Sequence, residues 1–272
     1  MIRHNDKEKV QEFYDFVSPF FQSFWGEHLH HGYWIHGDET RQMAQMQLVE
    51  HLAKTAKIRP GLQILDIGCG IGGSSIYLAK HYQATATGIT ISPIQVEMAT
   101  QAAAEGGVNA KFRLMDAEAM KFDRLFDLVW SVESVSHYQE IPKFFTAVAK
   151  LLQPNGTLAL IDWFKKENLD EKQYKKEILP IEKGMLVELG TIQDYQKMMR
   201  ASGLEIFTSE VMNKNCEKTW KLGADIIKNK MLWKLAAKNG SMFVDFLRAF
   251  RAMKSGFSTG NFVYGLIIAR KV

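Results

Sequence analysis

The chain has 272 residues, of which 46% are hydrophobic and 24% are charged, the proportions of a globular protein with a sizeable core. These proportions exclude a disordered or collagen-like chain, and the two cysteines exclude a disulfide scaffold and a Cys-rich zinc site. Lys and Arg exceed Asp and Glu by 34 − 30 = 4, which is too small an excess to indicate nucleic-acid binding by itself.

The positive charge is concentrated in residues 211–272, which contain 12 basic and 3 acidic side chains. This asymmetry indicates either helices with solvated lysine faces or a basic surface that faces an anionic substrate or a membrane surface. No apolar run approaches the length of about 18 residues that spans a membrane, and the first residues lack the apolar stretch of a signal peptide. We therefore expect a cytoplasmic protein without stable membrane insertion.

The first 57 residues form two helical segments joined by an unusual linker. Residues 6–25 are rich in aromatic side chains at helical spacing, and residues 38–57 return to a helical period. Between them lies the stretch Trp25-Gly26-Glu27-His28-Leu29-His30-His31-Gly32-Tyr33-Trp34.

From residue 63 onwards, apolar strands alternate with helices. This alternation predicts parallel strands with helices on both faces of one sheet. The expected strands cover residues 63–67, 84–89, 110–114, 126–131 and 157–162, and the expected helices cover 74–81, 93–105 and 141–152.

The pattern loosens after residue 164. Thr191, followed by Asp194 in the capping-box position, predicts the start of a helix that ends near residue 203. A strand is expected at 204–210, a lysine-rich helical stretch at 216–255 and a last apolar strand at 262–269.

We expect one domain over residues 1–272. Residues 1–57 and insertions at about 164–200 and 216–257 would form a helical cap over the carboxyl edge of the sheet, where open α/β sheets bind ligands.

The strongest functional signal is the turn Asp66-Ile67-Gly68-Cys69-Gly70-Ile71-Gly72-Gly73 between an apolar strand and a helix. Glycines let the backbone approach a ligand closely, and the helix N-terminus faces that ligand. The glycine spacing also matches G-x-G-x-x-G, so a nicotinamide-dependent oxidoreductase is an alternative. Asp66 disfavours it, because a pyrophosphate would meet a negative charge, and the next strand ends at Thr90 without an acid for a ribose. A cationic ligand group suits Asp66 better, and S-adenosylmethionine carries an α-ammonium.

With these motifs the chain resembles the class I S-adenosylmethionine-dependent methyltransferases. Within them it is most similar to the tocopherol and sterol methyltransferase branch, with mycolic-acid cyclopropane synthases more distant. The resemblance implies a seven-stranded, Rossmann-like, doubly wound α/β sheet whose last strand is antiparallel, with a helical cap. It rests on Tyr14-Asp15-x-x-Ser18, Trp25 to Tyr33, Gly88 to Gln95, Trp130-Ser131-x-Glu133-Ser134-x-x-His137 and Tyr264-Gly265.

The resemblance also implies which residues hold the cofactor. Asp66, Gly68 and Gly70 would line its amino-acid part, and Asp116 would accept from the adenine amine. The full set expected to bind S-adenosylmethionine, with S-adenosylhomocysteine as product, is Tyr14, Gly32, Tyr33, Asp66, Gly68, Gly70, Thr90, Ile91, Gln95, Asp116, Ala117 and Ser131.

The expected reaction is methyl transfer to a small-molecule acceptor, with no nucleic-acid partner. Carbon methylation of an aromatic or isoprenoid acceptor is the leading interpretation, and nitrogen or oxygen methylation of a natural-product-like or amine acceptor is the alternative. Displacement at an activated methyl group needs placement and exclusion of water, and carbon methylation also needs a base. The candidates for catalysis are Glu133, His137, His31 and Tyr14.

Each candidate also has a structural interpretation. Glu133 would be a buried acid bonded to the N-terminal cap, and His137 would make a helix-end contact. The histidines of the linker invite a metal site, but no second cluster of ligands has suitable spacing, so no metal is expected. A cofactor-binding protein without catalysis also stays open. Apolar residues at helical spacing would form either core or a lid over the pocket: Met242, Phe243, Phe246, Leu247, Phe250, Met253 and Phe257.

Overall fold

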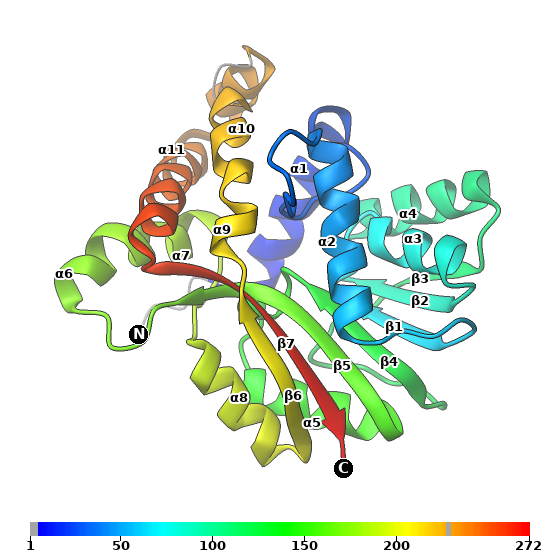
Figure 1. Cartoon of the computed structure of the whole chain (residues 1–272). Coiled ribbons are helices and arrows are strands. Elements are labelled where there is room, and N and C mark those ends of the chain that lie inside the picture. Colours follow the sequence, from blue (N-terminus) through cyan, green and yellow to red (C-terminus); the bar gives the residue numbers. More distant parts are fainter. Residues whose placement is uncertain (1–4, 227–229) are drawn as a thin grey trace.

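A seven-stranded sheet runs through the molecule (Figure 1). The computed structural model describes residues 5–226 and 230–272, except the side chains of Phe24 and of residues 223–243, so the predictions for Met242 and Phe243 lie outside the described residues. The strands follow the order β3-β2-β1-β4-β5-β7-β6. Their bounds are β1 Gln63–Ile67, β2 Thr85–Thr90, β3 Ala110–Leu114, β4 Phe126–Val132, β5 Leu152–Lys165, β6 Leu204–Val211 and β7 Phe262–Lys271.

The strand directions confirm the predicted sheet. Strands β1 to β5 pair in parallel, and β7 lies between β5 and β6, antiparallel to both. Asp66 in β1 is level with Gly88 in β2 and with Trp130 in β4. The carboxyl ends of these three central strands therefore meet at one edge of the sheet.

Helices cover both faces of the sheet, because the central strands are apolar on both sides. One core joins the sheet to α2, α3, α7 and α11, and the other joins it to α5 and α8. The helices are α1 Lys7–Trp25, α2 Arg41–Thr55, α3 Gly73–His81, α4 Pro93–Gly106, η1 Val135–His137, α5 Ile141–Leu151, α6 Glu171–Gln173, η2 Tyr174–Ile178, α7 Leu179–Met185, α8 Ile192–Ala201, α9 Asn213–Cys216, α10 Lys218–Ile226 and α11 Lys230–Thr259.

Residues 164–200, expected to form one cap insertion, divide between two places. Helix α7 packs against α11 at the carboxyl edge of the sheet, whereas α8 packs beneath the sheet against α5 and β6 (Figure 1). The start of α8 is the predicted capping box, since Thr191 Oγ1 accepts from the Asp194 backbone N–H and Asp194 accepts from the Thr191 backbone N–H. None of the described helices is long and apolar enough to cross a membrane.

Candidate active site

A cavity opens at the carboxyl ends of β1, β2 and β4, beneath α1 and α11. The glycine turn and polar side chains of the loops after the strands line one part of it, and apolar side chains, most of them from α1 and α11, line another. Most of the sequence-predicted site residues line it together: Tyr14, His31, Asp66, Gly68, Gly70, Thr90, Ile91, Gln95, Asp116, Ala117, Glu133 and His137.

The glycine turn needs glycine for two different reasons. Gly68 and Gly70 both have positive φ, at 72° and 54°. A Cβ on Gly68 would lie 1.9 Å from Ser134 Oγ, so packing also forbids a side chain there. A Cβ on Gly70 would meet only Leu29, at 3.8 Å, so this position is open to the cavity. The backbone at Gly70 is therefore free to approach a ligand.

Asp66 is a buried acid beside this turn. Its carboxylate accepts a 2.6 Å hydrogen bond from Ser75 Oγ in the first turn of α3. Burial raises the pKa of Asp66 to about 7, because little else stabilises its charge. A cation bound beside Asp66 would provide the missing stabilisation.

The end of β2 is tied to α1 through polar side chains. Thr90 Oγ1 donates to Gln95 Oε1 at 2.6 Å, and Gln95 Nε2 donates to Ser18 Oγ at 3.0 Å. Ser92 Oγ donates to Asp15 of the same helix. Thr90 and Gln95, both expected to bind the cofactor, thus also hold α1 over the cavity.

The loop after β3 carries a carboxylate bonded to the first turn of α1. Lys7 Nζ lies 2.7 Å from Asp116 Oδ2 and 2.9 Å from Glu118 Oε2. Asp116 Oδ1 accepts from the Glu118 backbone N–H, which fixes the loop.

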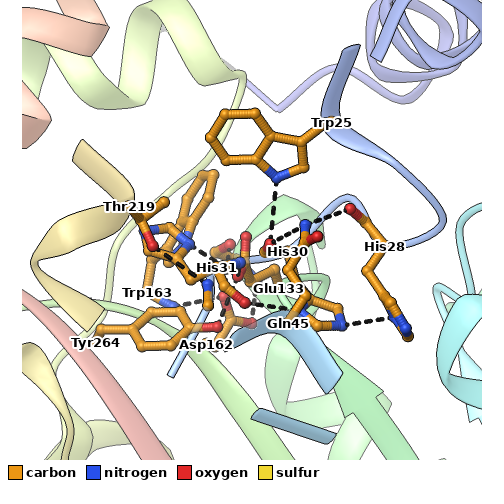
Figure 2. Close-up of polar contacts among 12 residues, drawn as sticks. Trp25, His28, His30, His31, Gln45, Glu133, Asp162, Trp163, Thr219 and Tyr264 are labelled. Carbon is orange, nitrogen blue, oxygen red and sulfur yellow. Dashed lines mark hydrogen bonds and ion pairs between the residues drawn. The ribbon is translucent and has the colours of Figure 1, made fainter. Parts of the chain in front are cut away.

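Glu133 follows β4 and lies where distant parts of the chain meet (Figure 2). Its backbone adopts the left-handed conformation, with φ 53°, and its N–H donates to Ile161 O. Three donors converge on Oε1: the His31 backbone N–H at 2.7 Å, His31 Nδ1–H at 2.9 Å and the Tyr264 hydroxyl at 2.6 Å. Burial opposes ionisation, but these donors outweigh it, so the pKa of Glu133 lies below its ordinary value.

The His31 ring is enclosed by aromatic side chains. It stacks on Tyr264 at 4.4 Å between ring centroids and meets the edge of Trp220 at 4.8 Å. Its Nε2 is buried without a hydrogen-bond partner among the described residues. His31 therefore directs its polar side at Glu133 and its remaining surface at the aromatic wall.

Tyr14 and His137 form a second polar pair in the cavity wall. Tyr14 Oη lies 2.9 Å from His137 Nε2, and His137 Nδ1 lies 3.0 Å from Leu186 O. Because only Nδ1–H can donate to the carbonyl, Nε2 accepts a hydrogen bond from the Tyr14 hydroxyl. Burial lowers the pKa of His137 to about 4, so the ring is neutral near pH 7.

Three predicted cofactor residues lie outside the lining of this cavity: Gly32, Tyr33 and Ser131. Gly32 is required by packing, since a Cβ there would lie 2.6 Å from the Trp34 ring. Tyr33 stacks on His51 of α2 at 4.4 Å. Ser131 alternates with Val132 along β4 and lies on the other face of the sheet, while Val132 and Glu133 reach the cavity.

The chain matches the family model for mycolic acid cyclopropane synthetase over residues 2–262. It belongs to this family of S-adenosylmethionine-dependent methyltransferases. It is 32% identical to the 27-O-demethylrifamycin SV methyltransferase of Amycolatopsis mediterranei, over 95% of each chain. It is 30% identical to a probable tocopherol O-methyltransferase of Oryza sativa subsp. japonica, over 97% of this chain and 78% of the relative. The crystal structure of a mycolic acid cyclopropane synthase complexed with SAH and CTAB superposes with a TM-score of 0.86 at 20% identity, over 97% and 98% of the two chains.

This methyltransferase uses S-adenosylmethionine to methylate small molecules. Its residues fit that cofactor. Asp66 offers a buried negative charge that lacks a cation, the backbone at Gly70 is open to the cavity, and the Asp116 carboxylate lies at the same edge of the sheet.

Two linker histidines lie at the rim of the methyltransferase cavity without forming a metal site. His30 Nδ1–H donates to His31 O, so His30 Nε2 accepts from His28 Nδ1–H at 3.1 Å. Burial lowers the pKa of both rings. Among the described residues, no group of three or more His, Cys, Asp or Glu side chains is arranged to hold a metal ion.

Sequence reasoning missed three aromatic side chains that pack against His31 in the methyltransferase site: Trp163, Trp220 and Tyr264. Tyr264 was noted only as part of the resemblance, and Trp163 and Trp220 were not singled out. Tyr264 and Glu133 are 131 residues apart, and no spacing pattern marks such a contact. The one usable signal was a tyrosine inside an otherwise apolar strand segment, because a buried phenol usually has a hydrogen-bond partner.

Proposed function

We propose that this methyltransferase transfers the methyl group to a carbon atom of an apolar acceptor of the aromatic or isoprenoid type, and that Glu133 takes the proton that the acceptor then loses. The apolar half of the cavity supports such an acceptor. It is formed by aromatic, aliphatic and methionine side chains of α1, α11 and the sheet: Val10, Phe13, Val17, Phe21, Trp163, Phe246, Phe250 and Met253.

The observation that carries the proposal is the geometry of Glu133. All three donors bind Oε1, and no donor of the described residues reaches Oε2. The Glu133 side chain lines the cavity and is 10% exposed, so Oε2 is the oxygen that it offers to the cavity. Oε2 is therefore the oxygen of the Glu133 carboxylate that an acceptor can reach.

The bound cofactor supplies an activated methyl group. Asp66 and the glycine turn would hold that cofactor, and an acceptor carbon in the apolar half of the cavity would take its methyl group. The methyl–sulfur bond would break as the new bond forms, so that S-adenosylhomocysteine would leave neutral and the acceptor would carry the positive charge. The acceptor then loses a proton to Glu133 Oε2 and becomes neutral. The aromatic rings of Trp163, Trp220 and Tyr14 exclude water and stabilise positive charge during transfer.

The basicity of the site favours carbon as the methylated atom. Glu133 has a pKa below its ordinary value and His137 has a pKa of about 4, so both are weak bases near neutral pH. A weak base removes a proton readily from a cationic carbon skeleton, but poorly from an alcohol or a phenol. Tyr14 and His137 then serve as a neutral hydrogen-bonding pair that orients a polar group of the acceptor.

Oxygen methylation is the second candidate, because both relatives described above are named for it in whole or in part: one acts on 27-O-demethylrifamycin SV and the other is called a tocopherol O-methyltransferase. In that reaction Glu133 Oε2 or the Tyr14–His137 pair would accept the hydroxyl proton during transfer. Nitrogen methylation needs only loss of an amine proton afterwards.

A product analysis separates these candidates. Purified protein is incubated with [methyl-¹³C]S-adenosylmethionine and a panel that contains a prenylated hydroquinone, a sterol, 27-O-demethylrifamycin SV and an amine. The ¹³C chemical shift of the product distinguishes methyl on carbon from methyl on oxygen or nitrogen. We expect a carbon-bound methyl group on an isoprenoid-bearing acceptor, and an oxygen-bound or nitrogen-bound methyl group as the sole product would overturn the proposal.

The variant Glu133→Gln tests the role of the carboxylate. We expect a 10²- to 10⁴-fold loss of kcat with unchanged affinity for S-adenosylhomocysteine. The matched control is Glu205→Gln, which removes an exposed carboxylate from β6 and should leave both values unchanged. Wild-type turnover in Glu133→Gln would return Glu133 to the structural role that the sequence left open.

A further inference from the structure

Tyr264 is a rigidly placed hydroxyl donor on the last strand of the sheet. Its side chain is fully buried, and its backbone is fixed on both sides. The Tyr264 N–H donates to Asn213 Oδ1 at 2.8 Å, and its carbonyl accepts from the Met212 N–H at 2.8 Å. The phenol ring also stacks on His31. The hydroxyl therefore has little freedom other than to donate its 2.6 Å hydrogen bond to Glu133 Oε1.

The hydrogen bond from Tyr264 determines which oxygen of the Glu133 carboxylate faces the cavity. A carboxylate can turn about its last bond and exchange its two oxygens. Two of the three donors to Oε1 come from His31, in the linker between α1 and α2, and the third comes from Tyr264 in β7. Tyr264 is thus the one of these donors that is built into the sheet.

We propose that Tyr264 is a positioning residue for methyl transfer: its hydroxyl holds Glu133 Oε1 so that Oε2 faces the acceptor as an ionised proton acceptor. This inference rests on the proposed role of Glu133. Tyr264 keeps its own proton throughout, and the proton from the acceptor goes to Glu133 Oε2.

A donor to an ionised carboxylate favours the ionised form, so loss of the Tyr264 hydroxyl should raise the pKa of Glu133 by about one unit. Other titratable groups around Glu133 also influence its ionisation and remain in place in the test. They come from the linker, α1, η1, β5 and α9: His30, His31, Tyr14, His137, Asp162 and Cys216.

The test compares Tyr264→Phe with Tyr195→Phe. Tyr195 is also fully buried, but its hydroxyl has no partner among the described residues, so its removal breaks no hydrogen bond. Protein labelled with [δ-¹³C]glutamate is titrated without ligand, and the Glu133 signal is assigned by its loss in Glu133→Gln. We expect the Glu133 midpoint to rise by about one pH unit in Tyr264→Phe and to stay constant in Tyr195→Phe. An unchanged midpoint in folded Tyr264→Phe would overturn the proposal.

A second variant covers the case in which Tyr264→Phe does not fold. Site-specific replacement of Tyr264 by 3-fluorotyrosine keeps the ring and makes the hydroxyl a stronger donor, so the Glu133 midpoint should fall. A midpoint that does not fall would contradict the proposal.

Turnover provides the second readout, with whichever acceptor of the panel is methylated. Tyr264→Phe should lower kcat about tenfold, leave KM nearly unchanged and move the acid limb of the pH profile upward. If Glu133→Gln keeps full activity, the proposed function fails while the titration still tests the Tyr264 contact. If Glu133→Gln is impaired but Tyr264→Phe has the wild-type pH profile, only the present inference fails.

Discussion

The phenolic hydroxyl of Tyr14 on α1 donates a hydrogen bond of 2.9 Å to Nε2 of His137, which lies 123 residues later in the chain. The other ring nitrogen, Nδ1, is held by Leu186 O at 3.0 Å, so both nitrogens of this buried histidine are occupied. The pair joins the N-terminal helix, the segment after β4 and the segment after α7 around one side chain.

This arrangement predicts how stability depends on pH. The pKa of His137 is about 4 in the folded protein and about 6.5 when unfolded, so the unfolded chain binds the extra proton first as the pH falls. Stability is therefore lost between about pH 6.5 and pH 4. In His137→Gln the loss of unfolding free energy from pH 7 to pH 5 should be smaller by about 2 kcal/mol. Urea denaturation at both pH values measures it.

His28 and His30 also have lowered pKa values, so the variant should keep part of the acid sensitivity. His36→Gln is the matched control, because it removes an exposed imidazole. Equal pH dependence in His137→Gln and the wild type would show that His137 is protonated equally in both states.

Asp66 predicts the pH dependence of cofactor binding. Its pKa is about 7 in the unliganded protein, and the α-ammonium of S-adenosylhomocysteine should bind its ionised form. Affinity should therefore be constant above about pH 7.5 and fall about tenfold per unit well below pH 7. Calorimetric titration from pH 5.5 to 8.5 checks this, and Asp66→Asn should bind weakly with no such pH dependence. A wild-type affinity that does not change over this range would exclude Asp66 as the ammonium partner.

Two glycines of the turn should differ in what their substitution changes: Gly68 the stability of the protein, and Gly70 the binding of S-adenosylhomocysteine. Gly68→Ala should lower the free energy of unfolding by about 3 kcal/mol or more, because strain at positive φ adds to the collision with Ser134. Gly70→Ala should cost only about 1 kcal/mol, yet abolish binding of S-adenosylhomocysteine because its methyl group points into the cavity. Urea denaturation and calorimetry measure the two effects.

Gly107→Ala is the matched control for backbone strain. Gly107 has φ 59° with nothing within 4 Å of an added Cβ, and it lies at the end of α4 away from the cavity. This variant should lose about 1 kcal/mol of unfolding free energy and bind S-adenosylhomocysteine as the wild type does. If Gly70→Ala binds as Gly107→Ala does, the turn does not contact the ligand as proposed.

The glycine turn and its place in the fold could be predicted from sequence because their signals are local. The glycine turn, the acid before it and the strand–helix alternation all lie within short segments, and the turn around Gly68 has the predicted place between β1 and α3. The same holds for the capping box at Thr191, which needs only four residues.

The surroundings of Glu133 could not be predicted in this way, because their contacts join distant segments. The Glu133 partners lie in the linker and in β7, more than 100 residues away on either side. In the linker, His31 was expected at the site and lines the cavity, but its neighbours Gly32 and Tyr33 face α2 instead. An aromatic-rich segment does not reveal which of its rings will be enclosed by others.

The position of β7 between β5 and β6 ties the hydrogen bonds of Glu133 to the insertion of this strand. Among the described strands, β6 pairs with β7 alone, and β7 also brings the Tyr264 hydroxyl to Glu133. During synthesis, the glycine turn, Asp66 and Glu133 leave the ribosomal exit tunnel long before Tyr264 does. A nascent chain can therefore form the turn between β1 and α3 early, but Glu133 gains its hydrogen bond from Tyr264 only when β7 inserts between its two neighbours.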